Sequence, residues 1–344
     1  MQDQSMSVES YTNSCLSCFR RCPREFDLRY QLQLERAGDD REVLQVGTTW
    51  HKAHDVATKA GDDAAAYNAI REHAPGAKWN EKLRRLFASY RWKWASQVLD
   101  IKRSEFQFDY LDVQGIRRRG QIDGVIEIDG ALGNLERKTS SEDLDDGSTF
   151  WQRQRMGSQV SLYANAFKEL TGKAPAFTLY DVVRKPTIRP KSIVKKDMTR
   201  LRAELDEKGT ATYFGEEIAG HEVEAALAEG RETLTFYGAR LTADIGDRPD
   251  FYFARKMIPR TTLDLDQSEN DTHLTIAMIE AMGKWSQFKS ELPVFPRNPD
   301  GCATFGLCDF FELCSNGEYP SAGQIPQGFA RRDALHPELE ESTQ

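Results

Sequence analysis

The sequence lacks any run of apolar residues long enough to cross a membrane. A transmembrane helix needs about 20 predominantly apolar residues in succession, and no such stretch occurs in the 344-residue chain. The N-terminal segment MQDQSMSVES also lacks the basic start and the apolar run of a signal peptide. We therefore expect a cytoplasmic protein with no membrane partner.

The chain also lacks the positive surplus that proteins coating duplex DNA usually carry. It has 46 lysines and arginines against 54 aspartates and glutamates, which gives a formal net charge of -8. Any contact with nucleic acid must therefore come from local basic patches or from a narrow channel. Hydrophobic residues make up 39% of the chain, which is enough to build a sizeable core.

Cysteine is absent from the whole central part of the chain, residues 23–301. The six cysteines lie in two groups near the ends: Cys15, Cys18, Cys22, Cys302, Cys308 and Cys314. In a reducing compartment, clustered cysteines more often bind a metal than form disulfides.

The spacing of apolar residues changes along the chain from helical to strand-like. Intervals of three and four residues predict helices, the alternation of Phe106, Phe108 and Tyr110 predicts a strand, and the segment AFTLYDVV (176–183) is typical of a buried strand. We expect helices at 14–30, 47–60, 78–98, 150–170, 197–208, 215–240 and 271–290, and strands at 106–110, 116–128, 134–139, 176–183 and 250–257. This order predicts an α/β fold with a small mixed sheet flanked by helices.

Two carboxylates and a lysine lie on neighbouring predicted strands. Because strand side chains alternate between faces, Glu136 and Lys138 point the same way and Arg137 points opposite. A tight turn can bring Asp123, on the preceding strand, next to that pair. Burying these carboxylates is costly without counter-charges, and Mg²⁺ or Mn²⁺ would supply them. The alternative is a surface ladder, because E-x-K is common by chance.

Other polar residues have spacings that suit the same site. Gln159 and Tyr163 lie four residues apart and so share one face of a predicted helix. His51 can offer an imidazole nitrogen to a metal, and His54, one helical turn further on, is a less favoured ligand. Alternatively, His51 and Tyr163 are ordinary core residues.

The order of these residues resembles the RecB-like branch of the PD-(D/E)XK nucleases, which includes the CRISPR-associated iron–sulfur exonucleases. The branch carries the motifs G-x-x-x-H, G-x-x-D, E-x-K and Q-x-x-x-Y. The matching segments here are Gly47–His51, Gly120–Asp123, Glu136–Lys138 and Gln159–Tyr163. The resemblance spans residues 14–316 and implies a restriction-endonuclease-like sheet with helical additions.

The resemblance also implies roles for individual residues. The implied metal ligands are the side chains of His51, Asp123 and Glu136 and the main-chain carbonyl of Arg137. Asp123, Glu136 and Lys138 would form the catalytic set, with Lys138 assisting the attack of water. Gln159 and Tyr163 would hold DNA or brace the site.

In the same branch, one N-terminal cysteine and three C-terminal ones hold a [4Fe–4S] cluster that joins the ends of the chain. Cys22 begins a segment, CPREF, that resembles the C-P-R-x-F of these enzymes. The implied cluster ligands are Cys22, Cys302, Cys308 and Cys314. Many relatives have a C-x-x-C pair near the C-terminus, whereas here five residues separate each neighbouring pair. Cys15 or Cys18 could replace Cys22 as the cluster ligand. Zinc is the alternative metal, and the C-x-x-C pair Cys15 and Cys18 could join a zinc site with Cys22; otherwise these two are buried thiols.

A basic segment, residues 184–196, follows the last strand of the predicted core and contains no acidic residue. Arg184 and Lys185 begin it, and we expect them to bind DNA. Further positive charge comes from Arg117, Arg118, Arg119, Arg153 and Arg155. Contacts to phosphate give affinity without sequence preference. The alternative is a solvated loop.

The sequence thus predicts a Mg²⁺- or Mn²⁺-dependent deoxyribonuclease, more an exonuclease than an endonuclease. It would act on single-stranded or duplex DNA ends in recombination, repair or replication, and a helicase or recombinase partner is left open. The alternative is a non-catalytic DNA-binding or assembly protein that keeps the fold. The intact Asp123, Glu136 and Lys138 argue against that alternative.

We expect a single domain over residues 1–320, followed by a mobile acidic tail at 321–344. The parts of the domain are an N-terminal helical part at 14–105, a catalytic core at 106–185, C-terminal additions at 186–292 and a cysteine clasp at 293–320.

Overall fold

A mixed five-stranded sheet forms the centre of the computed structural model, which describes residues 8–38, 42–286, 293–304, 306–321 and 323–339. In sheet order the strands are β2 (Asp100–Leu111), β3 (Arg117–Ile128), β4 (Ala131–Ser140), β5 (Thr178–Arg184) and β8 (Phe253–Ile258). β4 and β5 run parallel, and the remaining neighbours are antiparallel. The expected α/β fold is confirmed.

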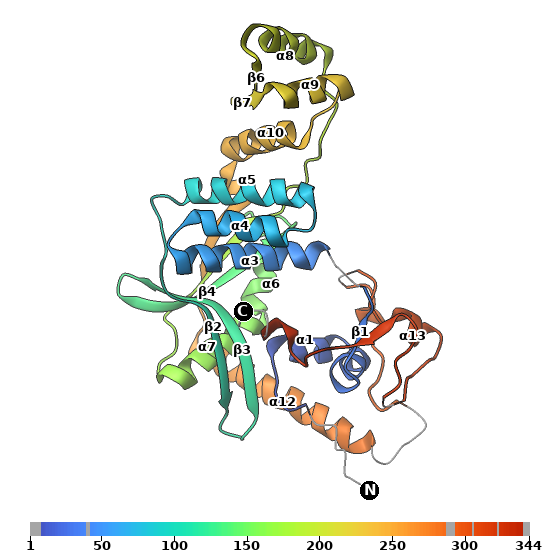
Figure 1. Ribbon diagram of the computed structural model, residues 1–344. Coiled ribbons are helices and arrows are strands. Elements are labelled where there is room, and N and C mark those ends of the chain that lie inside the picture. The colour runs from blue at the N-terminus through green and yellow to red at the C-terminus, as the bar shows by residue number, and fades with distance from the viewer. Residues whose placement is uncertain (1–7, 39–41, 287–292, 305, 322, 340–344) are drawn as a thin grey trace.

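Helices flank this sheet (Figure 1), and the described residues also form two short two-stranded sheets. The longer helices are α3 (Glu42–Ala60), α4 (Asp63–His73), α5 (Ala77–Lys93), α6 (Thr149–Met156), α7 (Ser158–Thr171), α8 (Lys195–Lys208), α9 (Gly220–Glu229), α10 (Leu234–Asp247) and α12 (Thr262–Ser286). The shorter elements are α1 (Asn13–Arg21), α2 (Pro23–Phe26), the π-helix η1 (Asp27–Gln31), β1 (Leu34–Arg36), β6 (Thr210–Tyr213), β7 (Glu216–Ala219), α11 (Pro249–Tyr252), α13 (Phe311–Ser315) and β9 (Phe329–Arg331). None of the helices in the described residues combines the length and apolarity that crossing a membrane requires.

A tight hairpin joins β3 to β4 and sets the two strands side by side. Ile128 pairs with Ala131, and the two turn residues between them, Asp129 and Gly130, have φ values of 51° and 78°. Two successive positive φ values are typical of a type I′ turn, whose twist matches the flanking strands. The strands therefore stay in register as they leave the turn.

The parallel step from β4 to β5 requires a crossover, which α6 and α7 provide. The helix predicted over 150–170 is therefore two helices. They separate at Gly157, whose ψ of 132° is extended rather than helical. The break turns α7 so that it packs against β3 and β4.

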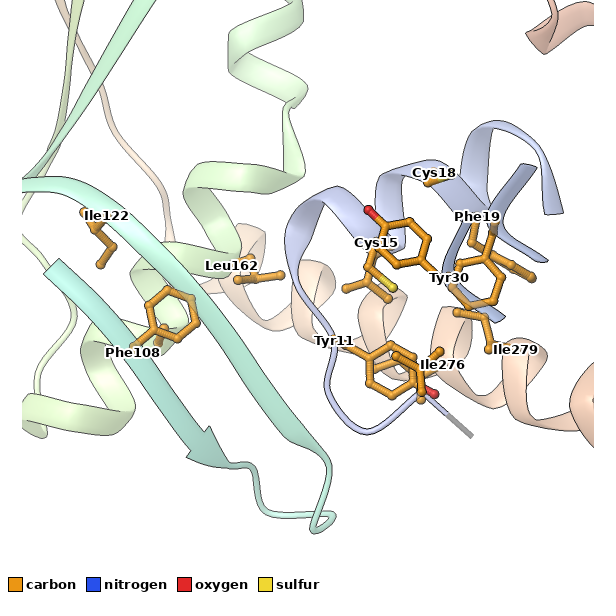
Figure 2. Close-up of a cluster of buried hydrophobic side chains, with 14 of the residues drawn as sticks. Tyr11, Cys15, Cys18, Phe19, Tyr30, Phe108, Ile122, Leu162, Ile276 and Ile279 are labelled. Carbon is orange, nitrogen blue, oxygen red and sulfur yellow. The ribbon is translucent and has the colours of Figure 1, made fainter. Parts of the chain in front are cut away.

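The core consists of several clusters of buried apolar side chains. The largest packs α1, α7 and α12 against β2 and β3, and Figure 2 shows side chains from these elements. A second packs α3, α4, α5 and α10 against β5 and β8. The candidate site described below lies where α3 and α7 meet the strands between these clusters.

A separate small unit is formed by α8, β6, β7 and α9, which enclose their own apolar cluster and lie beyond α10 in Figure 1. The prediction of one helix at 215–240 is wrong, because this stretch forms β7, α9 and the start of α10. Gly230 ends α9 in the left-handed region, at φ 64°, and the Thr233 side chain caps α10. β6 was also not predicted.

The two ends of the chain pack against each other. The helix predicted over 14–30 is interrupted at Cys22, which is extended (φ -156°), because Pro23 begins a new turn. Strand β9 pairs antiparallel with β1. Residues 329–331 of the expected mobile tail thus form a strand, and His336 is buried and donates from Nε2 to the Ser10 carbonyl over 2.9 Å. Residues 340–344 lie outside the described residues.

Candidate active site and cysteine cavity

The predicted metal ligands converge where β3 and β4 separate. The pairing between β3 and β4 runs from the turn to the pair Gly124–Leu135. One residue further, Asp123 faces β4, and its Oδ2 accepts a hydrogen bond from the Arg137 main-chain N–H at 2.6 Å. On the other side, Asp123 Oδ1 lies 3.4 Å from His51 Nδ1 on α3. The helix and the two strands thus bring His51, Asp123 and the E-x-K segment together.

Lys138 is held in place by two partners. Its Nζ lies 2.5 Å from Glu136 Oε1 and donates to Gln159 Oε1 at 2.8 Å. Gln159 in turn donates to the Tyr163 hydroxyl at 3.3 Å, and the Tyr163 ring packs edge-on against Phe108. Gln159 therefore contacts Lys138 directly, and Tyr163 contacts Gln159.

Arg137 and His54 lie on the side of the sheet that α3 covers. Arg137 is 2% exposed. The burial of His54, and secondly the charge of Arg137, hold the pKa of His54 well below its usual value. His54 packs among the rings of Trp50, Phe87 and Tyr90. His54 is thus a core histidine in an aromatic cage, away from the carboxylates.

Electrostatics in the site reflect crowded carboxylates. Burial raises the pKa of Glu136 to about 7, although Lys138 offsets part of the effect. Burial and the charge of Asp123 raise the pKa of Glu105 to about 7. Burial alone would lower the pKa of His51 and of Lys138, but the neighbouring carboxylates outweigh it and raise both. Burial would raise the pKa of Asp123, but the His51 charge and hydrogen bonds lower it. Such a group favours an added cation.

Sequence reasoning missed Glu105, which lies on β2 beside Asp123. One ligand atom from each of His51, Glu105 and Asp123 lies within 4.8 Å of the others. The alternation of apolar residues was used only from Phe106 onward, whereas β2 begins at Asp100. Predicting Glu105 requires the register between β2 and β3, and the sequence of a single strand does not give that register.

The four predicted cluster cysteines line one cavity of about 510 Å³. Its walls come from both ends of the chain: Cys22, Glu25, Arg297, Pro299, Cys302, Cys308, Phe310, Phe311, Cys314 and Ser315. The two ends are also tied by Asn298, whose main-chain N–H donates to Cys22 Sγ at 3.4 Å and whose amide donates to the Arg21 carbonyl at 2.7 Å.

Cys15 and Cys18 lie elsewhere, inside the largest apolar cluster. Figure 2 shows both on α1 among aromatic and aliphatic side chains. Burial raises the pKa of the Cys18 thiol to about 12. Both are buried thiols of the core.

The predicted DNA-binding residues lie at the end of β5. The Lys185 main-chain N–H donates to the carbonyl of Ser140, at the end of β4. The Arg184 guanidinium stacks on Phe251, 3.9 Å from the ring centre, and lies 3.4 Å from Asp143. The following segment is not a loose loop, because its carbonyls accept hydrogen bonds from Lys82, Tyr237 and Arg240.

Arg118 does not add to a basic surface, contrary to expectation. It is 1% exposed, and its guanidinium donates to Asp112 at 3.0 Å and to Glu269 at 3.1 Å. The neighbouring Arg117 is exposed and pairs with Asp109 at 2.7 Å. Alternation along β3 therefore buries the middle arginine of the three and leaves its neighbours outside.

Comparison with known proteins gives one family. The model of the PD-(D/E)XK nuclease superfamily matches residues 10–243, a stretch that includes His51, Asp123, Glu136 and Lys138. No curated protein matches the chain. The matched stretch spans more than half of the sequence and ends before the C-terminal cysteines. The chain belongs to the PD-(D/E)XK nuclease superfamily.

Proposed function

We propose that this nuclease is a metal-dependent deoxyribonuclease that degrades DNA from its ends with little sequence specificity. The observation that carries the proposal is the convergence of two buried carboxylates, Asp123 and Glu136, with the half-buried Lys138. A surface Glu–Lys ladder would be solvated, whereas Glu136 is 1% exposed.

The residues of this group fit a divalent cation. Glu136 Oε2 is buried without a hydrogen-bond partner among the described residues, and an unpaired buried carboxylate oxygen is costly unless an ion meets it. Carboxylate and carbonyl oxygens suit Mg²⁺ and Mn²⁺, and a neutral imidazole adds a nitrogen ligand. His51, Asp123, Glu136 and the Arg137 carbonyl would hold the ion.

The side chains around the ion would divide the work of phosphodiester hydrolysis. A bound divalent cation supplies Lewis-acid polarisation of the phosphate. Lys138 carries a positive charge that Glu136 and Gln159 keep in one position, where it can stabilise charge developing on the phosphate oxygens. The Asp123 carboxylate is oriented by the Arg137 N–H, so its free electron pairs need no rearrangement during the reaction.

We propose that the cysteine cavity holds a [4Fe–4S] cluster with a structural role. Four thiolates from Cys22, Cys302, Cys308 and Cys314 match the ligand number of a cubane cluster. Zinc remains the rival, but a single ion with Zn–S bonds of about 2.3 Å occupies little of a cavity this large. Hydrolysis needs no electron transfer, so the cluster would join the chain ends.

The second candidate function is DNA binding without cleavage, possible for any member of the fold that has lost catalysis. Arg184 and Lys185 lie at the same end of the sheet as Lys138, because Ser140 pairs with Arg184 across β4 and β5. These basic residues would serve either function. The complete carboxylate–lysine group favours the nuclease.

A digestion assay with Mn²⁺ tests the proposal. Anaerobically purified protein and its Lys138→Ala variant are incubated with end-labelled single-stranded DNA, linear duplex and closed circles. Loss of linear DNA with intact circles, abolished in the variant, supports an exonuclease. Cutting of circles would make it an endonuclease, and no cutting by protein with a loaded cluster would favour the binding role.

A further inference from the structure

Glu105 lies directly across from Asp123 in the central sheet. The pairs on either side are Ser104–Gly124 and Phe106–Ile122, so the antiparallel register places Glu105 opposite Asp123. Its φ of 49° is in the left-handed region, which is unfavourable for a residue with a long side chain. Strain of this kind persists where the surroundings hold the residue in place and is frequent at functional sites.

The Glu105 carboxylate is fixed on one side and open on the other. Oε2 accepts a hydrogen bond from the Gln121 side chain on β3. Oε1 is buried and has no hydrogen-bond partner among the described residues. One oxygen of the Glu105 carboxylate lies within 4.8 Å of a ligand atom of His51 and of a ligand atom of Asp123. Gln121 thus holds the side chain while leaving one oxygen for another partner.

The charges around Glu105 favour a cation as the partner of its Oε1. Asp123 and Asp55 face it with negative charge, and His51 and Arg137 with positive charge. Two carboxylates opposite each other on neighbouring strands repel. The adjoining Glu136 is buried and also has an unpartnered oxygen. Glu105 on β2 and Glu136 on β4 thus each have one buried oxygen without a hydrogen-bond partner among the described residues, and each carboxylate lies under the charge influence of Asp123 and His51.

We infer that Glu105 is a further metal-binding residue of the nuclease centre, forming with His51 and Asp123 a set of one imidazole and two carboxylates for a divalent cation. This inference rests on the proposed function. It extends the ligand set beyond the E-x-K segment to the first strand of the sheet. Mn²⁺ suits the mixture of one nitrogen and two oxygen donors and is the probe of choice.

The experiment measures Mn²⁺ binding without DNA, by calorimetric titration and by the paramagnetic resonance signal of free Mn²⁺. It compares the protein with its Glu105→Gln, Asp123→Asn and Glu127→Gln variants. Glu127 lies on β3 and pairs with Lys102 at 3.1 Å, so its variant is a control for the same chemical change. Thermal melting in chelator establishes that each variant is folded.

The expected result is a loss of about tenfold or more in Mn²⁺ affinity for Glu105→Gln, with Glu127→Gln unchanged. The rise in melting temperature that Mn²⁺ gives the parent protein should also shrink in Glu105→Gln. If Glu105→Gln binds Mn²⁺ within twofold of the parent while Asp123→Asn does not bind, the role of Glu105 is overturned and the proposed function stands. If the parent protein itself binds no Mn²⁺, both are overturned.

Discussion

The Arg137 main-chain N–H donates to Asp123 Oδ2 over 2.6 Å, one residue beyond the last pair of the β3–β4 ladder. The bond replaces a ladder hydrogen bond with a side-chain contact. It fixes the carboxylate against β4 and leaves Oδ1 toward His51. The separation of two strands thus creates the space in which the acidic side chains gather.

Removing the amide of Gln159 should impair cleavage without unfolding the protein. Gln159→Ala frees Lys138 from its hydrogen bond on α7, so we expect the cleavage rate to fall about 10- to 100-fold, as for loss of an orienting contact. Single-turnover cleavage of linear duplex measures the change. The control Tyr163→Phe removes a longer bond of 3.3 Å and should have a smaller effect. Equal effects of the two changes would contradict the bracing role of Gln159.

Arg118 should matter for stability and not for cleavage. Arg118→Ala leaves the buried carboxylate of Asp112 without its guanidinium partner, and breaking a buried ion pair costs about 3–5 kcal/mol. Arg117→Ala removes only the exposed pair with Asp109, which is worth about 0–1 kcal/mol. Urea unfolding of the two variants measures the difference. Similar losses of unfolding free energy in both would show that the burial of Arg118 is unimportant.

His54 should make stability depend on pH. Burial, and then the charge of Arg137, lowers the pKa of His54 in the folded protein, whereas the unfolded residue binds a proton below about pH 6.5. The folded state therefore loses stability as pH falls below that value, by at most about 1.4 kcal/mol per pH unit. Unfolding of metal-free His54→Phe between pH 7 and pH 5 should show a shallower decline than the parent protein. The same change at the exposed His221 is the control, and an unchanged slope in His54→Phe would refute the assignment.

The cysteines should separate into two classes. Replacing Cys308 by alanine removes a wall of the cavity, so purified protein should lose its iron and its brown colour and should melt at a lower temperature. Replacing Cys15, which lies in the apolar core, should keep the iron. Iron and zinc analysis of anaerobically purified protein measures both. Zinc in place of iron in the parent protein would support the rival metal.

The sequence predicts those site residues whose positions depend on a single strand and its turn, and it does not predict those whose positions depend on the register between strands. Asp123, Glu136 and Lys138 followed from strand alternation and a short turn, and the structure brings them together. Glu105 depends on the register between two strands and on a left-handed backbone. Neither can be derived from the alternation of one strand.

The fold shows the same division. The strand at 106–110 follows from alternating apolar residues and the strand at 176–183 from an apolar stretch. The stretch 215–240, in contrast, was predicted as one helix, although Gly230 and Thr233 mark the end of one helix and the start of another. The packing of residues 329–331 on β1 was also missed. It depends on a contact between the two ends of the chain, which a polar composition does not reveal.

The central claim is that Lys138 acts in catalysis at a metal site built by Asp123 and Glu136. The most direct test is single-turnover cleavage of linear duplex DNA by Lys138→Ala, measured beside its Mn²⁺ affinity and its melting temperature. The control is Lys173→Ala, an exposed lysine after α7. We expect a loss of at least about 100-fold in rate, with Mn²⁺ still bound and the fold intact, and no loss in the control. Cleavage by Lys138→Ala at the rate of the parent protein would contradict the central claim.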